Sequence, residues 1–312
     1  MAVATGQGSD STSGERAALP SEALDGRAGW RAEALGPPRA VEVEHGTVAC
    51  HDRGTGRPLV FVHGALVNAN LWRKVVEPLS RDFRCVVPDL PLGSHRLPLH
   101  PGADLSPPGL ADLIANVIGE LGLENPVLIG NDTGGGLCQI VAANHPETLG
   151  GLVLTSCDAF DNFPPKAFRP LVRLAAGVPG VLQGVMAPMR VSPIRRAPIA
   201  YGWLAKKPFD RRTADSYAMP VTASAGVRRD TRAAFAGLDP RHTLDAAARL
   251  PAFDRPALIA WAREDRFFPT AHAERLAEIL PDARLEWIDD SYTFVSEDQP
   301  ERLVDLIAGF AG

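Results

Sequence analysis

One aspartate lies among glycines where an apolar run gives way to a helical pattern. The segment VLIGNDTGGG, residues 127–136, sets Asp132 between Gly130 and Gly134. Glycine permits a tight turn from strand to helix because a side chain would clash there, and the residue at the apex then projects above the sheet. A carboxylate in that place could act as a nucleophile or as a proton carrier. Taken alone, the string also fits a glycine-rich loop with an N-capping aspartate.

The elements that must position Asp132 indicate a buried parallel sheet. From Ala40 onward, short β-type runs alternate with helical patterns, and six strands precede residue 157. Strand-like runs stop between Phe160 and Pro251, then return at PALIAWA and ARLEWID before a closing helix that starts at Pro300. We therefore predict an α/β fold with a mostly parallel eight-stranded sheet, flanked by helices and interrupted by a helical cap.

This pattern divides the chain into four parts. Residues 1–38 are rich in Gly, Ser, Ala and Pro and poor in bulky apolar side chains, so we expect a disordered tail. Residues 39–159 and 252–312 should form the two halves of the core, and residues 160–251 the inserted cap.

Four motifs together resemble the α/β-hydrolase superfamily, and the resemblance runs from about Ala40 to the C-terminus. LVFVHG is similar to the family's oxyanion strand, VVPDLP to its next strand and loop, VLIGNDTGG to its nucleophile elbow, and ALIAWAREDRFFP to its acid turn. The resemblance implies an enzyme with Asp132 as nucleophile and an oxyanion hole made by the amides of Ala65 and Thr133. An aspartate at the elbow resembles the haloalkane dehalogenase and epoxide hydrolase branch, not the serine esterases.

The same resemblance places the triad acid at Asp265, with Glu264 as the near alternative, and reveals a missing base. WIDDSYTFVSEDQPE is similar to the family segment that carries the catalytic histidine, but Thr293 stands at that position and His272 is the last histidine of the chain. A threonine hydroxyl cannot activate the water that hydrolyses an alkyl ester. Loss of the base costs factors of about 10⁴ to 10⁶ in other hydrolases, so we expect a covalent ester to accumulate.

Other groups could take over the missing role. His63, His242 and His272 are the substitute bases to consider, with His63 and His242 the two to test first. Alternatively, Asp132 and Asp265 would share a pocket in which repulsion and burial keep one of them protonated. The oxyanion amides and the following helix favour charge on Asp132, so Asp265 is the expected proton carrier. Such a pair could run isomerisation, elimination or cyclisation without a covalent step.

Aromatic residues of the predicted cap are candidate substrate contacts: Phe160, Tyr201, Trp203 and Tyr217. The resemblance to epoxide hydrolases makes the two tyrosines candidates for polarising an epoxide oxygen, although aromatic packing between cap helices is the more ordinary explanation. Dehalogenases carry a tryptophan after the nucleophile and a second halide-binding side chain. This chain has Thr133 and Ala65 instead, so halide stabilisation is not expected.

Composition limits the partners. The net charge of −5 comes from mixed charges, which predicts no nucleic-acid or membrane partner. The N-terminus lacks a signal-peptide pattern, the four cysteines lack metal or disulfide spacing, and the glycines near Gly134 lack the nucleotide-binding fingerprints. We therefore expect a cytoplasmic protein that acts on a small apolar organic molecule without cofactor or metal. The oligomeric state is not indicated.

Three functions fit these observations. The first is a hydrolase that attacks an apolar electrophile through Asp132. The second is a non-hydrolytic isomerase, cyclase or lyase of the same fold. The third is a catalytically silent protein that retains a ligand pocket, and the fold alone does not separate the three.

Overall fold

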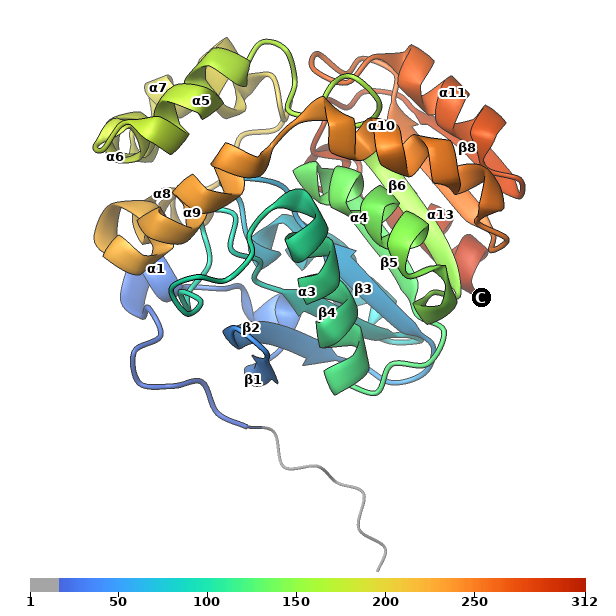
Figure 1. Ribbon diagram of the computed structural model, residues 1–312, viewed down its shortest axis with the longest axis horizontal. Coiled ribbons are helices and arrows are strands. Elements are labelled where there is room, and N and C mark those ends of the chain that lie inside the picture. The colour runs from blue at the N-terminus through green and yellow to red at the C-terminus, as the bar shows by residue number, and fades with distance from the viewer. Residues whose placement is uncertain (1–16) are drawn as a thin grey trace, which may run out of the picture.

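The computed structural model describes residues 17–312, and its centre is one eight-stranded sheet (Figure 1). The strand order is β1-β2-β4-β3-β5-β6-β7-β8. The pairs β1–β2 and β2–β4 are antiparallel, and all later neighbours are parallel. The strands are β1 (Pro38–Val43), β2 (Gly46–Arg53), β3 (Pro58–Val62), β4 (Arg84–Pro88), β5 (Val127–Asp132), β6 (Gly151–Cys157), β7 (Ala257–Ala262) and β8 (Ala283–Ile288). The predicted sheet, with six strands up to residue 157, is confirmed.

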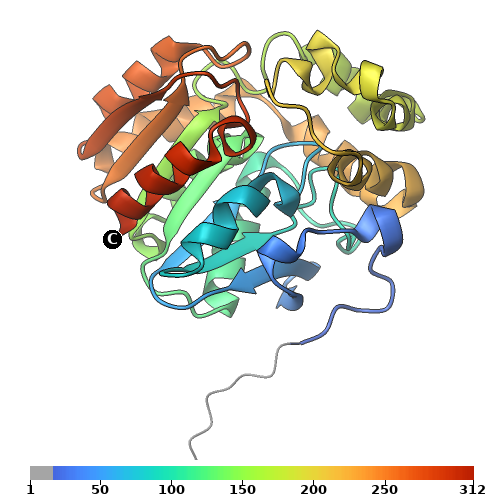
Figure 2. The ribbon, with the colours of Figure 1, turned by 180° about the vertical axis from the view of Figure 1, so that it is seen from behind.

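Helices cover both faces of the sheet because its central strands are apolar on both sides. Every residue of β5, β6 and β7 is buried, as expected for parallel strands between two helical layers. One face carries α2 (Arg73–Leu79) and α13 (Pro300–Ala311), which pack together (Figure 2). The other face carries α3 (Pro107–Glu120), α4 (Thr133–Asn144), α10 (Pro240–Arg249) and α11 (Thr270–Ile279). Short helical turns are α1 (Gly26–Gly29), η1 (Glu33–Leu35), η2 (Ala69–Trp72), η3 (Pro146–Thr148), η6 (Leu250–Ala252) and α12 (Val295–Asp298).

The insertion between β6 and β7 is helical and lies over the end of the sheet that carries Asp132. Its elements are α5 (Arg169–Gly177), α6 (Val181–Met186), η4 (Ala187–Arg190), α7 (Ser192–Arg195), η5 (Pro198–Gly202), α8 (Arg211–Ala223) and α9 (Ala225–Gly237). We call these elements the cap. The expected boundary at residue 251 is too late, because α10 packs along α4 in the core layer (Figure 1). No helix in the described part of the chain combines the length and apolar character needed to cross a bilayer.

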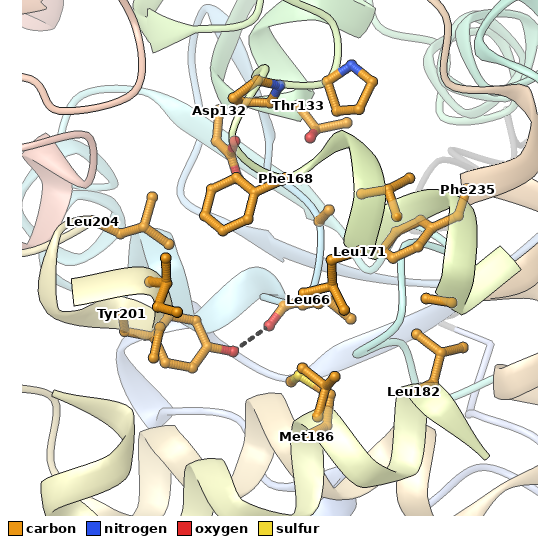
Figure 3. Close-up of a pocket in the computed structure, with 18 of the residues that line it drawn as sticks. Leu66, Asp132, Thr133, Phe168, Leu171, Leu182, Met186, Tyr201, Leu204 and Phe235 are labelled. Atoms are coloured by element: carbon orange, nitrogen blue, oxygen red, sulfur yellow. Dashed lines mark hydrogen bonds between the residues drawn. The ribbon is translucent and has the colours of Figure 1, made fainter. Parts of the chain in front are cut away.

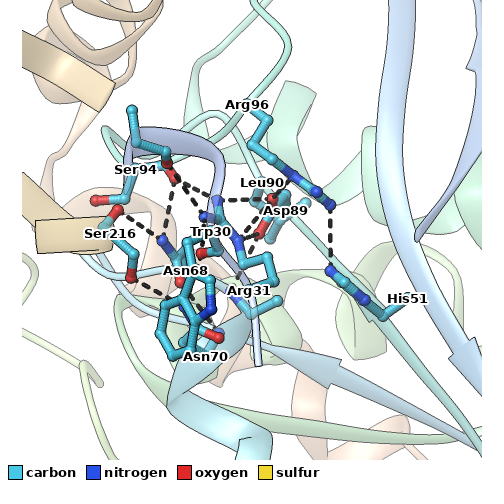
Figure 4. Close-up of polar contacts among 12 residues, drawn as sticks. Trp30, Arg31, His51, Asn68, Asn70, Asp89, Leu90, Ser94, Arg96 and Ser216 are labelled. Carbon is cyan, nitrogen blue, oxygen red and sulfur yellow. Dashed lines mark hydrogen bonds and ion pairs between the residues drawn. The ribbon is translucent and has the colours of Figure 1, made fainter. Parts of the chain in front are cut away.

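The expectation of a disordered tail over residues 1–38 is wrong for the part that the structure describes; residues 1–16 lie outside it. Leu35 is fully buried, and the buried Arg31 pairs with Asp89 at 2.8 Å (Figure 4). Asn70 donates to the carbonyl of Trp30 and to the hydroxyl of Ser216 in α8. Composition missed this order because the segment is attached to the core and the cap mainly through a few buried polar contacts, together with Leu35.

Candidate active site

The turn that presents Asp132 is strained and closely packed. Asp132 ends β5 with φ 55° and ψ −133°, a conformation that residues other than glycine adopt rarely and that often marks functional sites. A Cβ atom at Gly134 would lie 2.4 Å from the carbonyl oxygen of Val62, and one at Gly130 would lie 2.6 Å from Cα of Gly135. The glycines therefore let α4 start directly against the end of β3, as the sequence pattern predicts.

The carboxyl group of Asp132 lies against the turn that follows β3. A Cβ atom at Gly64 would lie 2.2 Å from its Oδ2, so only glycine fits there. The amide of Thr133 is close enough to the carboxyl group to stabilise its charge and lower its pKa. Ala65 and Thr133 both line the same cavity as Asp132. The structure thus brings the two residues predicted for the oxyanion hole next to the predicted nucleophile.

Asp132 lies at the wall of an apolar cavity beneath the cap (Figure 3). The cavity opens to solvent. Apolar side chains of the cap, among them Leu171, Leu182 and Met186, form most of its lining. Among the described lining residues, Asp132 and Tyr201 are the only ones with ionisable side chains. A single carboxyl group therefore faces an otherwise apolar space, as in many small-molecule sites.

Burial shifts the pKa of Asp132 to the neutral range. Removal of the carboxylate from water raises its pKa to about 7, the Thr133 amide opposes this shift, and the negative charge of Asp265 adds to it. Both protonation states of Asp132 are therefore populated near neutral pH, which suits a group that accepts and returns a proton.

Asp265 lies behind Asp132, in the loop after β7, and does not line the cavity. Its Oδ1 accepts the amides of Phe267 and Phe268, each at 2.8 Å, while its buried Oδ2 has no hydrogen-bond partner. Burial raises the pKa of Asp265 to about 6, against those amides and the nearby hydroxyls of Thr293 and Ser156. Those hydroxyls are close enough to act on the charge but do not form regular hydrogen bonds to Oδ2.

Which carboxyl group of the pair holds the proton stays a prediction. Burial raises the pKa of both groups, the charge of Asp265 further raises the pKa of Asp132, and two amides stabilise the charge of Asp265. The alternative acid Glu264 points to the surface, where it pairs with Lys206 at 2.8 Å. Of the two candidates in this loop, Asp265 is the one that faces the site.

Thr293 occupies a well-fixed position without supplying a base. It is fully buried, its hydroxyl has no hydrogen-bond partner, and its carbonyl accepts Nδ2 of Asn131 at 2.8 Å. The next amide, of Phe294, donates to the carbonyl of Leu204 in the cap at 2.7 Å. Glu297 further ties the segment to Arg73 of α2. The backbone that carries a histidine in the resembled family is thus held in place around a threonine.

None of the histidines considered as substitute bases lies next to Asp132. His63 is fully buried: its Nδ1 lies 2.8 Å from the carbonyl of Gly64, its Nε2 accepts the amide of Leu90, and burial lowers its pKa to about 4. His242 contacts Arg241 on α10, and His272 lies 3.8 Å from Asp161. All eight histidines belong to the described residues, and none lines the cavity. The structure therefore brings no imidazole to Asp132.

Only one of the four predicted aromatic contacts reaches the cavity. Tyr201 lines it, and its hydroxyl donates to the carbonyl of Leu66 at 2.8 Å. Tyr217 is buried against Tyr201 and Phe209. Trp203 lies outside the cavity, 41% exposed. Phe160 is buried, and its ring makes an edge-to-face contact with the ring of His272. Periodicity alone could not separate these packing roles from substrate contact.

A third buried carboxyl group, Asp158, was missed. It follows β6 directly, its Oδ2 accepts the hydroxyl of Thr133 at 3.3 Å, and its amide donates to the carbonyl of Asp132. Its Oδ1 is buried without a partner, and burial together with the charge of Asp132 raises its pKa well above the usual range. A signal was present, since carboxyl ends of parallel strands meet at one edge and Asp158 follows such a strand. Within residues 17–312, no cluster of three or more His, Cys, Asp or Glu side chains could hold a metal ion.

Comparison with known proteins agrees with this geometry. The model of the alpha/beta hydrolase family matches residues 59–306. Haloalkane dehalogenase 2 of Mycobacterium tuberculosis is 26% identical over 288 residues, which span 86% of this chain and 93% of that protein. An uncharacterized protein of the same species is 28% identical over 266 residues, covering 82% of this chain and 76% of the relative. The crystal structure of a putative ancestral haloalkane dehalogenase superposes with a TM-score of 0.71 at 23% identity, covering 88% of this chain and 98% of that one.

These matches extend over most of the chain, and the family model alone covers well over half of it. The protein therefore belongs to the alpha/beta hydrolase family of enzymes.

Proposed function

We propose that the enzyme hydrolyses a small apolar electrophile, such as an epoxide or an ester, and that Asp132 is the reacting group. The observation that supports this most directly is a lone carboxyl group, with a pKa near 7, at the wall of an apolar cavity without an imidazole. The apolar lining favours an uncharged substrate, since a second buried charge would lack a partner there.

Without a histidine, direct attack by water is the route that the site can complete. For an epoxide, ionised Asp132 takes one proton from a water molecule while the water oxygen bonds to a ring carbon. The ring C–O bond breaks, its electron pair stays on the ring oxygen, and Asp132 returns the proton to that oxygen. A pKa near 7 lets one group perform both transfers at neutral pH. The amide of Thr133 stabilises the carboxylate before the first transfer and after the second.

Attack by Asp132 itself would give an alkyl ester, as the family resemblance implies. Hydrolysis of that ester requires a base, and neither Thr293 nor any histidine supplies one. Asp158 and Asp265 lie behind Asp132 and outside the cavity. Neither of them therefore contacts a substrate or a water molecule that is bound in the cavity. The covalent route therefore ends at the ester.

A second candidate is non-hydrolytic proton transfer, such as isomerisation of an apolar substrate. The observation that favours it is the carboxyl group with a pKa of about 7 at the wall of an apolar cavity. It differs from hydrolysis in that no oxygen from water enters the product.

The experiment combines a substrate panel with isotope labelling. The protein is incubated in ¹⁸O-water with epoxides, esters and haloalkanes, and the products and the intact protein mass are followed together. Direct hydrolysis predicts one ¹⁸O atom in the first-turnover product and an unchanged protein mass. A mass increase on Asp132 would instead support the covalent route, and unlabelled isomeric product the second candidate. Binding without any reaction by the wild-type protein would overturn an enzymatic role for Asp132.

Thr293→His is the companion variant. If an ester forms on Asp132, the restored imidazole should release it and convert a stalled protein to turnover. If water attacks directly, the variant should change the rate without altering where the label goes. Glu264→Gln serves as the control, because this surface carboxyl group in the same loop as Asp265 should leave the products and rates unchanged.

A further inference from the structure

The cap carries almost all of the large apolar side chains that the described chain exposes. Eight such side chains are at least 37% exposed, and seven of them lie between residues 171 and 203. We call these seven the outer cap face: Leu171, Leu174, Val178, Val191, Ile194, Ile199 and Trp203. Single exposed apolar residues are ordinary, but a group of this size in one short segment marks a binding surface.

The outer cap face is continuous with the cavity. Leu171, Leu174 and Val178 follow a spacing of three and four residues along α5 and its C-terminal end, which places them on one side. Leu171 and Ile199 belong to the outer cap face and also line the cavity that holds Asp132. The helices α5, α6 and α7 lie at the outer edge of the molecule, on the opposite side from β1 and β2, in both views (Figures 1 and 2). The outer cap face is therefore next to the opening of the cavity that holds Asp132.

The same segment is positively charged in an otherwise acidic chain. The whole protein has a net charge of −5, yet residues 162–209 contain no Asp or Glu. They contain eight basic residues: Lys166, Arg169, Arg173, Arg190, Arg195, Arg196, Lys206 and Lys207. Some of these pair with acids of other segments, such as Arg190 with Asp215, but Arg173 and Arg196 have no ion-pair partner within the described residues.

A groove next to the outer cap face adds three more cations. Arg228, Arg229 and Arg232 of α9 line it together with Pro179 and Gly180, directly after Val178. The guanidinium groups of Arg228 and Arg232 donate to main-chain carbonyls of α8 and α5. Within residues 17–312, only Arg229 of the three pairs with a carboxylate, that of Asp230. Two of the cations therefore keep their charge available to an anion.

We propose that the outer cap face docks onto the surface of an anionic lipid bilayer. Exposed leucine, isoleucine and valine side chains would enter the boundary of the acyl chains, Trp203 would lie among the headgroups, and the arginine groove would contact phosphates. Contact with a second copy of the chain is disfavoured, because a twofold interface would oppose two basic faces. Docking in this orientation presents the cavity mouth to the lipid, so an apolar substrate reaches Asp132 without crossing water.

The test is flotation of the full-length protein with vesicles. We expect binding to vesicles of phosphatidylcholine mixed with phosphatidylglycerol, weaker binding to phosphatidylcholine alone, and loss of binding as salt is raised. Leu174→Glu should abolish binding, whereas Leu244→Glu should not, because Leu244 is the one exposed large apolar side chain outside the face among residues 17–312. Arg228→Gln and Arg232→Gln should each weaken partitioning about fivefold, and the exposed Arg81→Gln of the core should not.

The outcomes distinguish a lipid bilayer from a second copy of the chain as the partner of the outer cap face. Equal binding of the Leu174→Glu and Leu244→Glu proteins, or no preference for anionic vesicles, would overturn the proposal. So would a dimer in analytical ultracentrifugation that Leu174→Glu dissociates, since a second copy would then cover the face. Circular dichroism checks that each variant is folded. The inference goes beyond the reaction at Asp132, and Asp132→Asn should bind vesicles like the wild type, so either proposal can fail without the other.

Discussion

Two segments meet behind the cavity, the turn at Asp132 and the loop at Thr293. Both have a well-fixed main chain, but they differ in the side chain that they present. The turn has a strained backbone, packed glycines and a neighbouring amide, and it presents the carboxyl group that we propose as the reacting group. The loop keeps only the backbone, fixed through Asn131, Leu204 and Arg73, around a hydroxyl without a partner. A fixed main chain can therefore be present without a side chain that acts as a base. For this reason we propose a reaction that uses the carboxyl groups.

The largest expected effect removes the reactive group from the turn. Asp132→Asn keeps the shape of the side chain but can neither attack nor take a proton, so we expect the rate of product formation to fall by about 10³-fold or more. Steady-state kinetics on the best substrate of the panel measures this. Undiminished turnover by this variant would mean that the side chain of Asp132 does not take part in the reaction.

The next effect tests whether the turn is as tightly built as its contacts indicate. A methyl group at Gly134 would lie 2.4 Å from the main chain of Val62, so Gly134→Ala should lower the free energy of unfolding by about 3 kcal/mol. Gly119→Ala in α3 is the matched control, since nothing lies within 4 Å of its Cβ position and alanine favours a helix. Urea denaturation should show opposite signs for the two variants.

A smaller effect concerns stability as a function of pH. A carboxyl group whose pKa is raised on folding binds its proton more tightly in the folded state, so its stabilising contribution is complete below pH 4 and is lost as the pH rises. For Asp265 and Asp132 this loss should occur between about pH 4 and their raised values of about 6 and about 7. Asp132→Asn should therefore stabilise the protein at pH 8 by roughly 2 kcal/mol and much less at pH 5. Thermal unfolding at the two pH values measures the difference, and equal changes at both would contradict the assigned pKa.

The smallest effect belongs to the loop. Thr293→Val removes a buried hydroxyl that makes no regular hydrogen bond but helps to stabilise the charge of Asp265, so we expect unchanged activity and a change in stability of at most about 1 kcal/mol. A loss of activity in Thr293→Val, measured beside wild type at the same pH, would show that the hydroxyl takes part in the reaction and that the contrast between the two segments is overstated.

The sheet, the turn and the absent base could be predicted because each follows from local pattern. Alternation of strands with helices, glycines around Asp132 and the position of Thr293 all lie within short stretches of sequence. The order of the N-terminal segment could not, since the Arg31–Asp89 ion pair joins residues far apart in the chain. The role of Asp158 and the relative pKa values of Asp132 and Asp265 depend on burial and on which amides point at which oxygen. The total charge also hid the basic cap, because it averages over acidic residues elsewhere.

Asn131 determines how a histidine introduced at residue 293 would be held. Its Nδ2 contacts the carbonyls of Thr155, Ser156 and Thr293, so the residue beside Asp132 also fixes the main chain at residue 293. A histidine placed there by Thr293→His would start from a main chain that is already in position, so one substitution is the smallest change that could add a base to this site.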